Sequence, residues 1–125
     1  MNIETVLILE KLFPGIKKDQ IEEFDNLQEF EQLSVECLAD VYGYDFERAI
    51  EALENDYPQL FDGTSVEYAE ELIDDCYDLE KTMGNLASYF DYEKFARDLI
   101  LGGDIAYWES QITEARYVIT NCYCI

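Results

Sequence analysis

The chain of 125 residues contains no histidine and only eight lysine and arginine residues. Without histidine, it lacks the side chain that most often acts as a general base near neutral pH. It also has no GxSxG, P-loop or GxGxxG motif, which would indicate a catalytic serine or a bound nucleotide. Because 29 residues are acidic, pairs of carboxylates carry no information about catalysis. The sequence therefore predicts that the protein is not an enzyme and has neither catalytic nor cofactor-binding residues.

Metal ligands are also scarce. The four cysteines form no CxxC pair; they are Cys37, Cys76, Cys122 and Cys124. A structural zinc site would need all four as thiolates, so we expect buried or tolerated thiols in a reducing cytosol. Asp62-Gly63 fits the middle of an EF-hand loop, but Pro58 and Ala69 would then be its first and last ligands. We predict no metal site, with weak binding of divalent cations to the acidic side chains as an alternative.

Long apolar runs are absent as well. The first residues, MNIETVLILEKLF, are too short and too acidic for a signal peptide. No stretch approaches the roughly 20 apolar residues that cross a bilayer. We expect a cytoplasmic protein of a bacterial cell that does not contact the membrane.

The residues that are present combine a core with an extreme charge. Hydrophobic residues make up 49% of the chain and aromatic residues 14%, so the chain can bury enough apolar surface to fold. Its formal net charge is -21, whereas solubility alone asks for a magnitude of roughly 2–8. Such a protein repels nucleic acid and anionic membranes, and the partner should be a basic DNA-binding protein or a nuclease complex.

The charge is concentrated in the middle of the chain. Residues 19–80 contain 21 acids and one base, a balance of -20. Residues 1–18 contribute +1 from three lysines and two acids, and residues 81–125 contribute -2 from four bases and six acids, which together give -21. The middle segment has amphipathic periodicity and is not of low complexity.

Periodicity and breakers predict an α+β protein that is predominantly helical, with about five amphipathic helices and a short carboxyl-terminal β-hairpin. We expect one compact domain over residues 1–125, or two small lobes of about 1–62 and 63–125. The expected helices are 3–13, 19–41 with a break near 25–26, one from 46 to before 58, 64–79 and 92–101, and the expected strands are 105–108 and 117–120.

The helix that starts at Thr64 has the clearest signals. Thr64 and Glu67 fit a capping box, and apolar residues from Val66 to Leu79 form one stripe. The acids on the opposite face are Glu67, Glu70, Glu71, Asp74, Asp75 and Asp78. They make seven like-charge pairs at i,i+3 or i,i+4, which cost about 1.5–3.5 kcal/mol together at low salt. An ordinary solvated face mixes signs, so we predict that this face has a function.

The spacing of these acids resembles that of DNA phosphates. Six carboxylates cover about 16 Å of helix, or roughly one per 2.8 Å, between the 3.4 Å of one DNA strand and the 1.7 Å of the duplex. The 21 acids of residues 19–80 equal the charge on about ten base pairs. We therefore predict DNA-mimicking carboxylates on this face. The preceding helix and loop extend the set with Glu47, Glu51, Glu54, Asp56 and Asp62. Arg48 interrupts it, and we expect it to neutralise Glu51 or Asp45.

The stretch from Ala87 to Leu99, ASYFDYEKFARDL, resembles the carboxyl-terminal signature of the ArdA-type antirestriction proteins. Residues 66–72, VEYAEEL, are similar to the acidic helix before that signature, and the resemblance covers roughly residues 20–105. It implies a dimeric, elongated DNA mimic from mobile elements that blocks type I restriction enzymes. It also implies structural roles for Asp91, Arg97 and Asp98.

We expect that the family's amino-terminal domain is missing, so that the protein covers less of a DNA groove. An inhibitor of a CRISPR effector, which also holds nucleic acid in a basic channel, is therefore a further candidate. The alternative to mimicry is a generic acidic binding module, such as an immunity protein or a chaperone for a basic partner. A mimic competes with DNA for one site, whereas a generic module does not.

Overall fold

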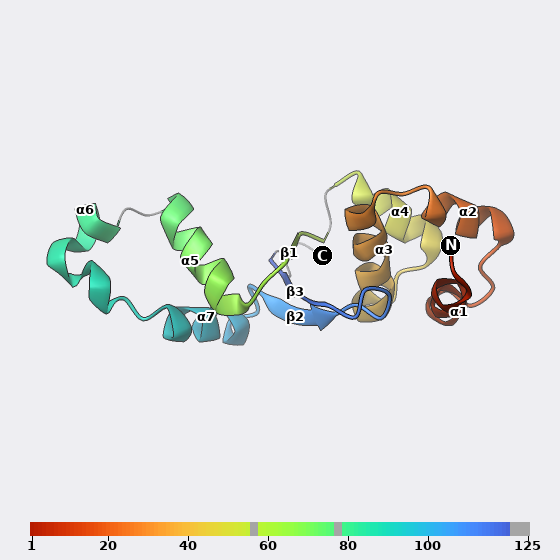
Figure 1. The fold of residues 1–125 in the computed structure, drawn as a ribbon. Coiled ribbons are helices and arrows are strands. Elements are labelled where there is room, and N and C mark those ends of the chain that lie inside the picture. Colours follow the sequence, from red (N-terminus) through yellow and green to blue (C-terminus); the bar gives the residue numbers. More distant parts are fainter. Residues whose placement is uncertain (56–57, 77–78, 121–125) are drawn as a thin grey trace.

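The computed structural model describes residues 1–55, 58–76 and 79–120, and Figure 1 shows their arrangement. Two groups of helices lie at opposite ends of the molecule, and a small sheet lies between them (Figure 1). The elements in chain order are α1 (Ile3–Leu12), α2 (Lys18–Asp25), α3 (Glu29–Tyr42), α4 (Phe46–Leu53), β1 (Leu60–Phe61), α5 (Ser65–Cys76), α6 (Leu79–Met83), the 3-10 helix η1 (Gly84–Tyr89), α7 (Tyr92–Leu101), β2 (Ala106–Glu109) and β3 (Arg116–Ile119).

Helices α1 to α4 share one hydrophobic core. Leu9 of α1, Phe24 of α2 and Leu38 of α3 are fully buried in it, and α4 adds Phe46 and Ala49. The side chain of Asp45, the expected N-cap of α4, accepts a hydrogen bond from the backbone N–H of Arg48 at 2.8 Å.

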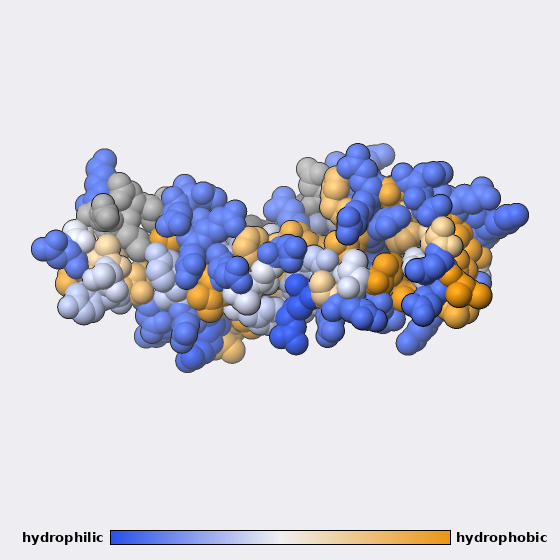
Figure 2. All heavy atoms as spheres, viewed as in Figure 1, coloured by the Kyte–Doolittle hydropathy of each residue, from blue (hydrophilic) through white to orange (hydrophobic). Residues whose placement is uncertain are grey.

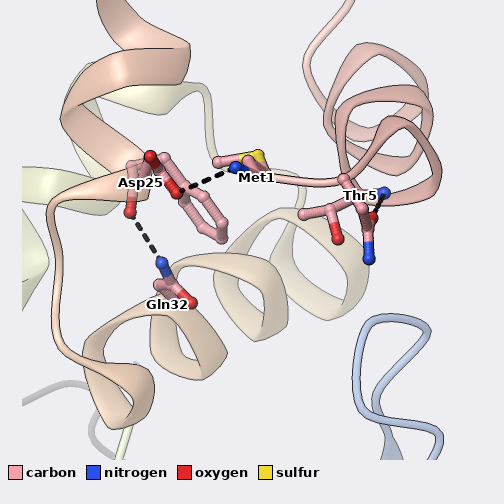
Figure 3. Close-up of polar contacts among 6 residues, drawn as sticks. Met1, Thr5, Asp25 and Gln32 are labelled. Atoms are coloured by element: carbon pink, nitrogen blue, oxygen red, sulfur yellow. Dashed lines mark hydrogen bonds and ion pairs between the residues drawn. The ribbon is translucent and has the colours of Figure 1, made fainter.

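The helix expected over 19–41 is divided, as the break near 25–26 indicated. Helix α2 ends at Asp25 and α3 begins at Glu29. The new start is stabilised locally, because the side chain of Glu31 accepts a hydrogen bond from the backbone N–H of Gln28 at 3.1 Å. Gln32 then donates its side-chain amide to the carbonyl oxygen of Phe24 at 2.9 Å (Figure 3), and the same oxygen accepts a hydrogen bond from the Leu27 backbone N–H at 3.1 Å.

The chain start lies against the same two helices. The amino group of Met1 is 3.8 Å from a carboxylate oxygen of Asp25 (Figure 3). Asn2 caps α1 by accepting a hydrogen bond from the backbone N–H of Thr5 at 2.8 Å. Helix α1 therefore extends over residues 3–12, in agreement with the predicted 3–13.

The sheet has the strand order β1-β3-β2, and both pairs are antiparallel. The predicted hairpin of β2 and β3 is confirmed, with Trp108 opposite Tyr117. Strand β1 has only two residues and was not predicted. One face of the sheet packs on α3, where Trp108 and Ile119 form a second core with Leu33 and Cys37. The sheet is thereby attached to the first helical group.

Helices α5 and α7 pack against each other in the second helical group. Ala69 and Ile73 of α5 and Ala96 of α7 are buried there. Asp91 caps α7 as expected, since it accepts a hydrogen bond from the backbone N–H of Lys94 at 3.0 Å. Two short elements, α6 and η1, connect α5 to α7.

The α+β, mostly helical fold class is confirmed, but the expected number of helices was too low. The described residues form seven α-helices and a three-stranded sheet. No helix in them has both the length and the apolar character needed to cross a membrane. Charged and polar residues cover most of the face in Figure 2, while apolar residues gather at the end formed by α1.

Candidate partner-binding surface

Helix α5 presents a row of acidic side chains and contains no lysine or arginine. Its start is the predicted capping box: Thr64 Oγ1 accepts a hydrogen bond from the Glu67 backbone N–H at 3.1 Å, and Glu67 Oε1 accepts one from the Thr64 N–H at 3.3 Å. Ser65, Ala69 and Ile73 point inward and are buried. The acids on the other side are all exposed; they are Glu67, Glu70, Glu71, Asp74 and Asp75. The predicted acidic face is therefore present from residue 67 to 75.

No ion pair to these carboxylates is found among the described residues. In the part of the chain that the structure describes, the ion pair of Met1 with Asp25 is the one found, and it lies in the other helical group. The same part of the chain contains no group of three or more cysteine and acidic side chains that could hold a metal ion. The charges on α5 are thus available to an external basic partner.

Helix α4 presents a second acidic face. Ala49 and Ala52 point into the core, whereas Glu47, Glu51 and Glu54 are exposed. The expectation that Arg48, the one basic residue among residues 19–80, neutralises Glu51 or Asp45 was wrong.

The guanidinium of Arg48 does not pair with Glu51 or Asp45 but lies over the ring of Tyr44, with its central carbon 3.9 Å from the ring centroid. A flat guanidinium is attracted to the electron-rich face of an aromatic ring, and this contact holds it away from the carboxylates.

The structure does not bring all predicted residues into one surface. Helix α4 belongs to one helical group and α5 to the other, on opposite sides of the sheet (Figure 1). Asp62 is exposed in the connection from β1 to α5. Asp56 and Asp78 lie outside the described residues. The candidate site therefore consists of two separate acidic faces, one on each helical group.

Further exposed acids lie in the same helical group as α4, and the sequence analysis did not include them among the site residues. They are Asp19, Glu22, Glu23, Asp25 and Glu29, on α2 and at the start of α3. The signal that could have found them is the same as for α5, namely a run of acids without lysine or arginine over residues 19–47.

Two acids of α3 have structural roles instead. Glu36 is completely buried and accepts hydrogen bonds from the Ser110 hydroxyl at 2.6 Å and the Gln111 backbone N–H at 2.7 Å. Asp40 accepts a hydrogen bond from the indole N–H of Trp108 at 2.9 Å. Both contacts attach the β2–β3 hairpin to α3. The comparison of the 21 acids of residues 19–80 with the charge on ten base pairs therefore counted too many surface carboxylates, because Glu36 faces the interior.

The environment of Glu36 also alters its titration. Burial raises the pKa of its carboxyl above the ordinary value, the neighbouring charge of Asp40 raises it further, and the hydrogen bonds from the hairpin oppose this change. The Ser110 oxygen already accepts hydrogen bonds from the N–H groups of Ile112 and Thr113, each at 3.1 Å. Its own hydrogen is therefore donated to Glu36.

The opposite face of the sheet is connected to α5. Side chains alternate along β2, so Tyr107 points away from the core in which Trp108 is buried. The Tyr107 hydroxyl accepts a hydrogen bond from the Ser65 backbone N–H at 3.1 Å and lies 2.6 Å from the Ser65 hydroxyl oxygen. Arg116 of β3 lies 5.6 Å from the centroid of the same ring. This contact joins the first turn of α5 to the sheet.

The fold and surface together define a mostly helical α+β protein that presents exposed carboxylates on both of its helical groups. Comparison with known proteins places it more specifically. The chain belongs to the ArdA family of antirestriction proteins, whose family model matches residues 8–114. Proteins of this family are inhibitors that bind type I restriction enzyme complexes, and the family is not one of enzymes. Neither a curated protein nor a solved structure gives a significant match.

Proposed function

We propose that this protein is a DNA mimic that inhibits a type I restriction enzyme by occupying its DNA-binding groove. The observation that carries the proposal is the row of exposed carboxylates on α5, to which no described residue forms an ion pair, in a member of an antirestriction family. From Glu67 to Asp75, five carboxylates cover eight residue steps, about 12 Å of helix, or roughly one per 2.4 Å. This linear charge density lies between that of one DNA strand, with a phosphate about every 3.4 Å, and that of the duplex, with one about every 1.7 Å.

The mechanism is electrostatic competition. Lysine and arginine residues that contact phosphates in the enzyme's groove meet carboxylates on α5, and the acids of α2 and α4 meet a second part of the groove. The cap at Thr64 and the packing of Ala69 and Ile73 hold α5 in place before binding, which lowers the ordering cost. The negative field accelerates association at low salt. Affinity should therefore fall steeply as ionic strength rises.

The test measures displacement of labelled duplex DNA from a purified type I restriction enzyme. One variant carries Glu70→Gln, Glu71→Gln, Asp74→Asn and Asp75→Asn. A matched control carries Glu10→Gln, Glu93→Gln, Glu109→Gln and Glu114→Gln, which removes four exposed charges outside α5 and the other acidic face. We expect the wild type and the control to displace DNA, and the α5 variant to require at least a tenfold higher concentration.

Two results would contradict the proposal. If the protein and DNA bind the enzyme at the same time, the acidic faces are not in the DNA groove and the protein is a different kind of binding module. If both quadruple variants weaken binding equally, net charge alone acts and the position of the carboxylates on α5 is irrelevant. The same assay with a CRISPR effector tests whether inhibition extends to another enzyme with a basic nucleic-acid channel.

A further inference from the structure

An exposed aromatic side chain of α3 lies beside the edge strand β1. Phe30, the second residue of α3, is 64% exposed. It lines two neighbouring hollows of about 570 and 380 Å³, and Leu60 of β1 lines both as well. Single exposed apolar residues are common on protein surfaces, whereas a larger apolar patch rimmed by polar residues marks a contact surface.

Apolar side chains form much of the lining of both hollows. Leu33 and Tyr117 line the larger hollow, and Leu53 and Pro58 line the smaller one. Pro58 is buried, and its carbonyl oxygen accepts a hydrogen bond from the Ser34 hydroxyl of α3 at 3.5 Å. We call this surface the Phe30 groove.

Strand β1 is an edge strand of the sheet and contributes backbone groups to the same place. The Thr120 N–H donates a hydrogen bond to the Gln59 carbonyl at 2.9 Å, so these two residues form a hydrogen-bonded pair of the antiparallel ladder. The next pair, Leu60 with Ile119, is then a non-hydrogen-bonded one. The N–H and C=O of Leu60 consequently point away from β3, and none of the described residues bonds to them. An added strand could use both groups.

The charges around the Phe30 groove determine which charge a bound segment should carry. Among the described residues, Glu29, Glu31 and Asp62 line the two hollows with their carboxylates, Tyr117 adds a phenol, and no lysine or arginine contributes. A negatively charged segment would be repelled, whereas a segment with lysine or arginine beside its apolar residues would be attracted.

We propose that the Phe30 groove binds an extended, basic segment of the target enzyme by addition of a strand to β1. Alternate side chains of a strand point to the same side. Two apolar residues at i and i+2 would therefore enter the hollows on the two sides of Phe30, while basic neighbours meet the acidic rim. Recognition by an exposed sheet edge with pockets for alternate side chains is a common mode of peptide binding.

This proposal rests on the proposed inhibition of a type I restriction enzyme and adds a contact that does not imitate DNA. The two kinds of contact differ in their response to salt. Ions screen the exposed carboxylates of α5, whereas burial of the Phe30 ring is not screened. The groove would give the protein a part of its affinity that persists at high ionic strength.

The experiment measures the dissociation constant for a purified type I restriction enzyme at about 0.05 and 0.3 M salt, where the Debye length falls from about 14 to 6 Å. The variants are Phe30→Ser and Phe30→Lys, and the control is Leu7→Ser, which removes an apolar side chain of α1 that is 58% exposed. Burial of roughly 100 Å² of ring surface predicts that Phe30→Ser weakens binding about 10- to 100-fold, by a similar factor at both salt concentrations. Phe30→Lys should weaken it at least as much, because it places a positive charge against a basic segment.

The outcomes separate the groove from the acidic faces. If the α5 quadruple variant loses binding but both Phe30 variants bind like the wild type, the groove proposal is wrong and DNA mimicry stands. If neither kind of variant affects binding, both proposals are wrong. If Phe30→Ser instead abolishes self-association in sedimentation equilibrium and leaves enzyme binding unchanged, a second copy of the chain occupies the groove and the proposal is overturned. Leu7→Ser should match the wild type throughout.

Discussion

The buried carboxyl of Glu36 leads to a prediction about stability as a function of pH. Its pKa is raised in the folded protein, mainly by burial, so at intermediate pH the folded state binds a proton that the unfolded state has lost. The contribution of Glu36 to the free energy of unfolding is greatest below the ordinary pKa of 4.5. It falls as the pH rises towards the folded pKa, with a slope of at most about 1.4 kcal/mol per pH unit.

The perturbation is Glu36→Gln, which keeps the shape but removes the titration. The amide oxygen can accept a hydrogen bond from the Ser110 hydroxyl or from the Gln111 N–H, while the amide nitrogen faces the other donor. Ser110 cannot compensate, because its oxygen already accepts from two N–H groups. One donor is left unsatisfied at a cost of about 1–3 kcal/mol, and the gain from removing a buried charge opposes this cost increasingly as the pH rises.

The assay is urea unfolding of both proteins at several pH values between about 5 and 8. Repulsion among the other acids acts in both proteins, so it cancels when their free energies of unfolding are subtracted. We expect the advantage of the wild type over Glu36→Gln to shrink as the pH rises. The control, Glu109→Gln, removes an exposed carboxylate of β2 and should give a difference that does not change with pH. An advantage of the wild type that grows with pH would show that hydrogen bonds to the carboxylate outweigh its burial, and would refute the reasoning.

Two further substitutions test how α5 is held. Tyr107→Phe removes the hydroxyl that bonds Ser65, and should lower the free energy of unfolding by about 1 kcal/mol; an unchanged urea midpoint would contradict this contact. Thr64→Ala removes the cap of α5 and should cost about 1 kcal/mol, with faster hydrogen exchange of the Glu67 amide; equal exchange in both proteins would show that the cap does not stabilise the first turn.

Much of the helical part could be predicted because its signals are local. Asp45, Thr64 and Asp91 each precede an apolar stripe, and each caps a helix in the structure. Strand β1 could not be predicted in this way. It has two residues, too few for an alternating pattern, and its partner Ile119 lies 59 positions away from Leu60. Such a strand depends on tertiary pairing rather than on its own sequence.

The positions of the acidic side chains could also be predicted only in part from the sequence. A face of acids opposite an apolar stripe is visible in the sequence, and the exposure of Glu70 and Asp74 agrees with it. The inward position of Glu36 is harder to see among many acids. It lies three residues after Leu33 and beside Cys37, both buried, so helical spacing already places it near the apolar side. The donors that make this tolerable come from a hairpin more than 70 residues later.

The separation of the two acidic faces has a consequence for how such a protein leaves its target. If α4 and α5 engage two places on one enzyme, the inhibitor is bivalent, and release requires both contacts to open together. Either face alone could then bind weakly and rebind quickly, while the whole chain dissociates slowly. The sheet sets the distance between the two contacts, since it is bonded to α3 through Glu36 and to α5 through Tyr107. A substitution in the sheet could therefore shorten the residence time of the inhibitor without touching a single carboxylate of either face.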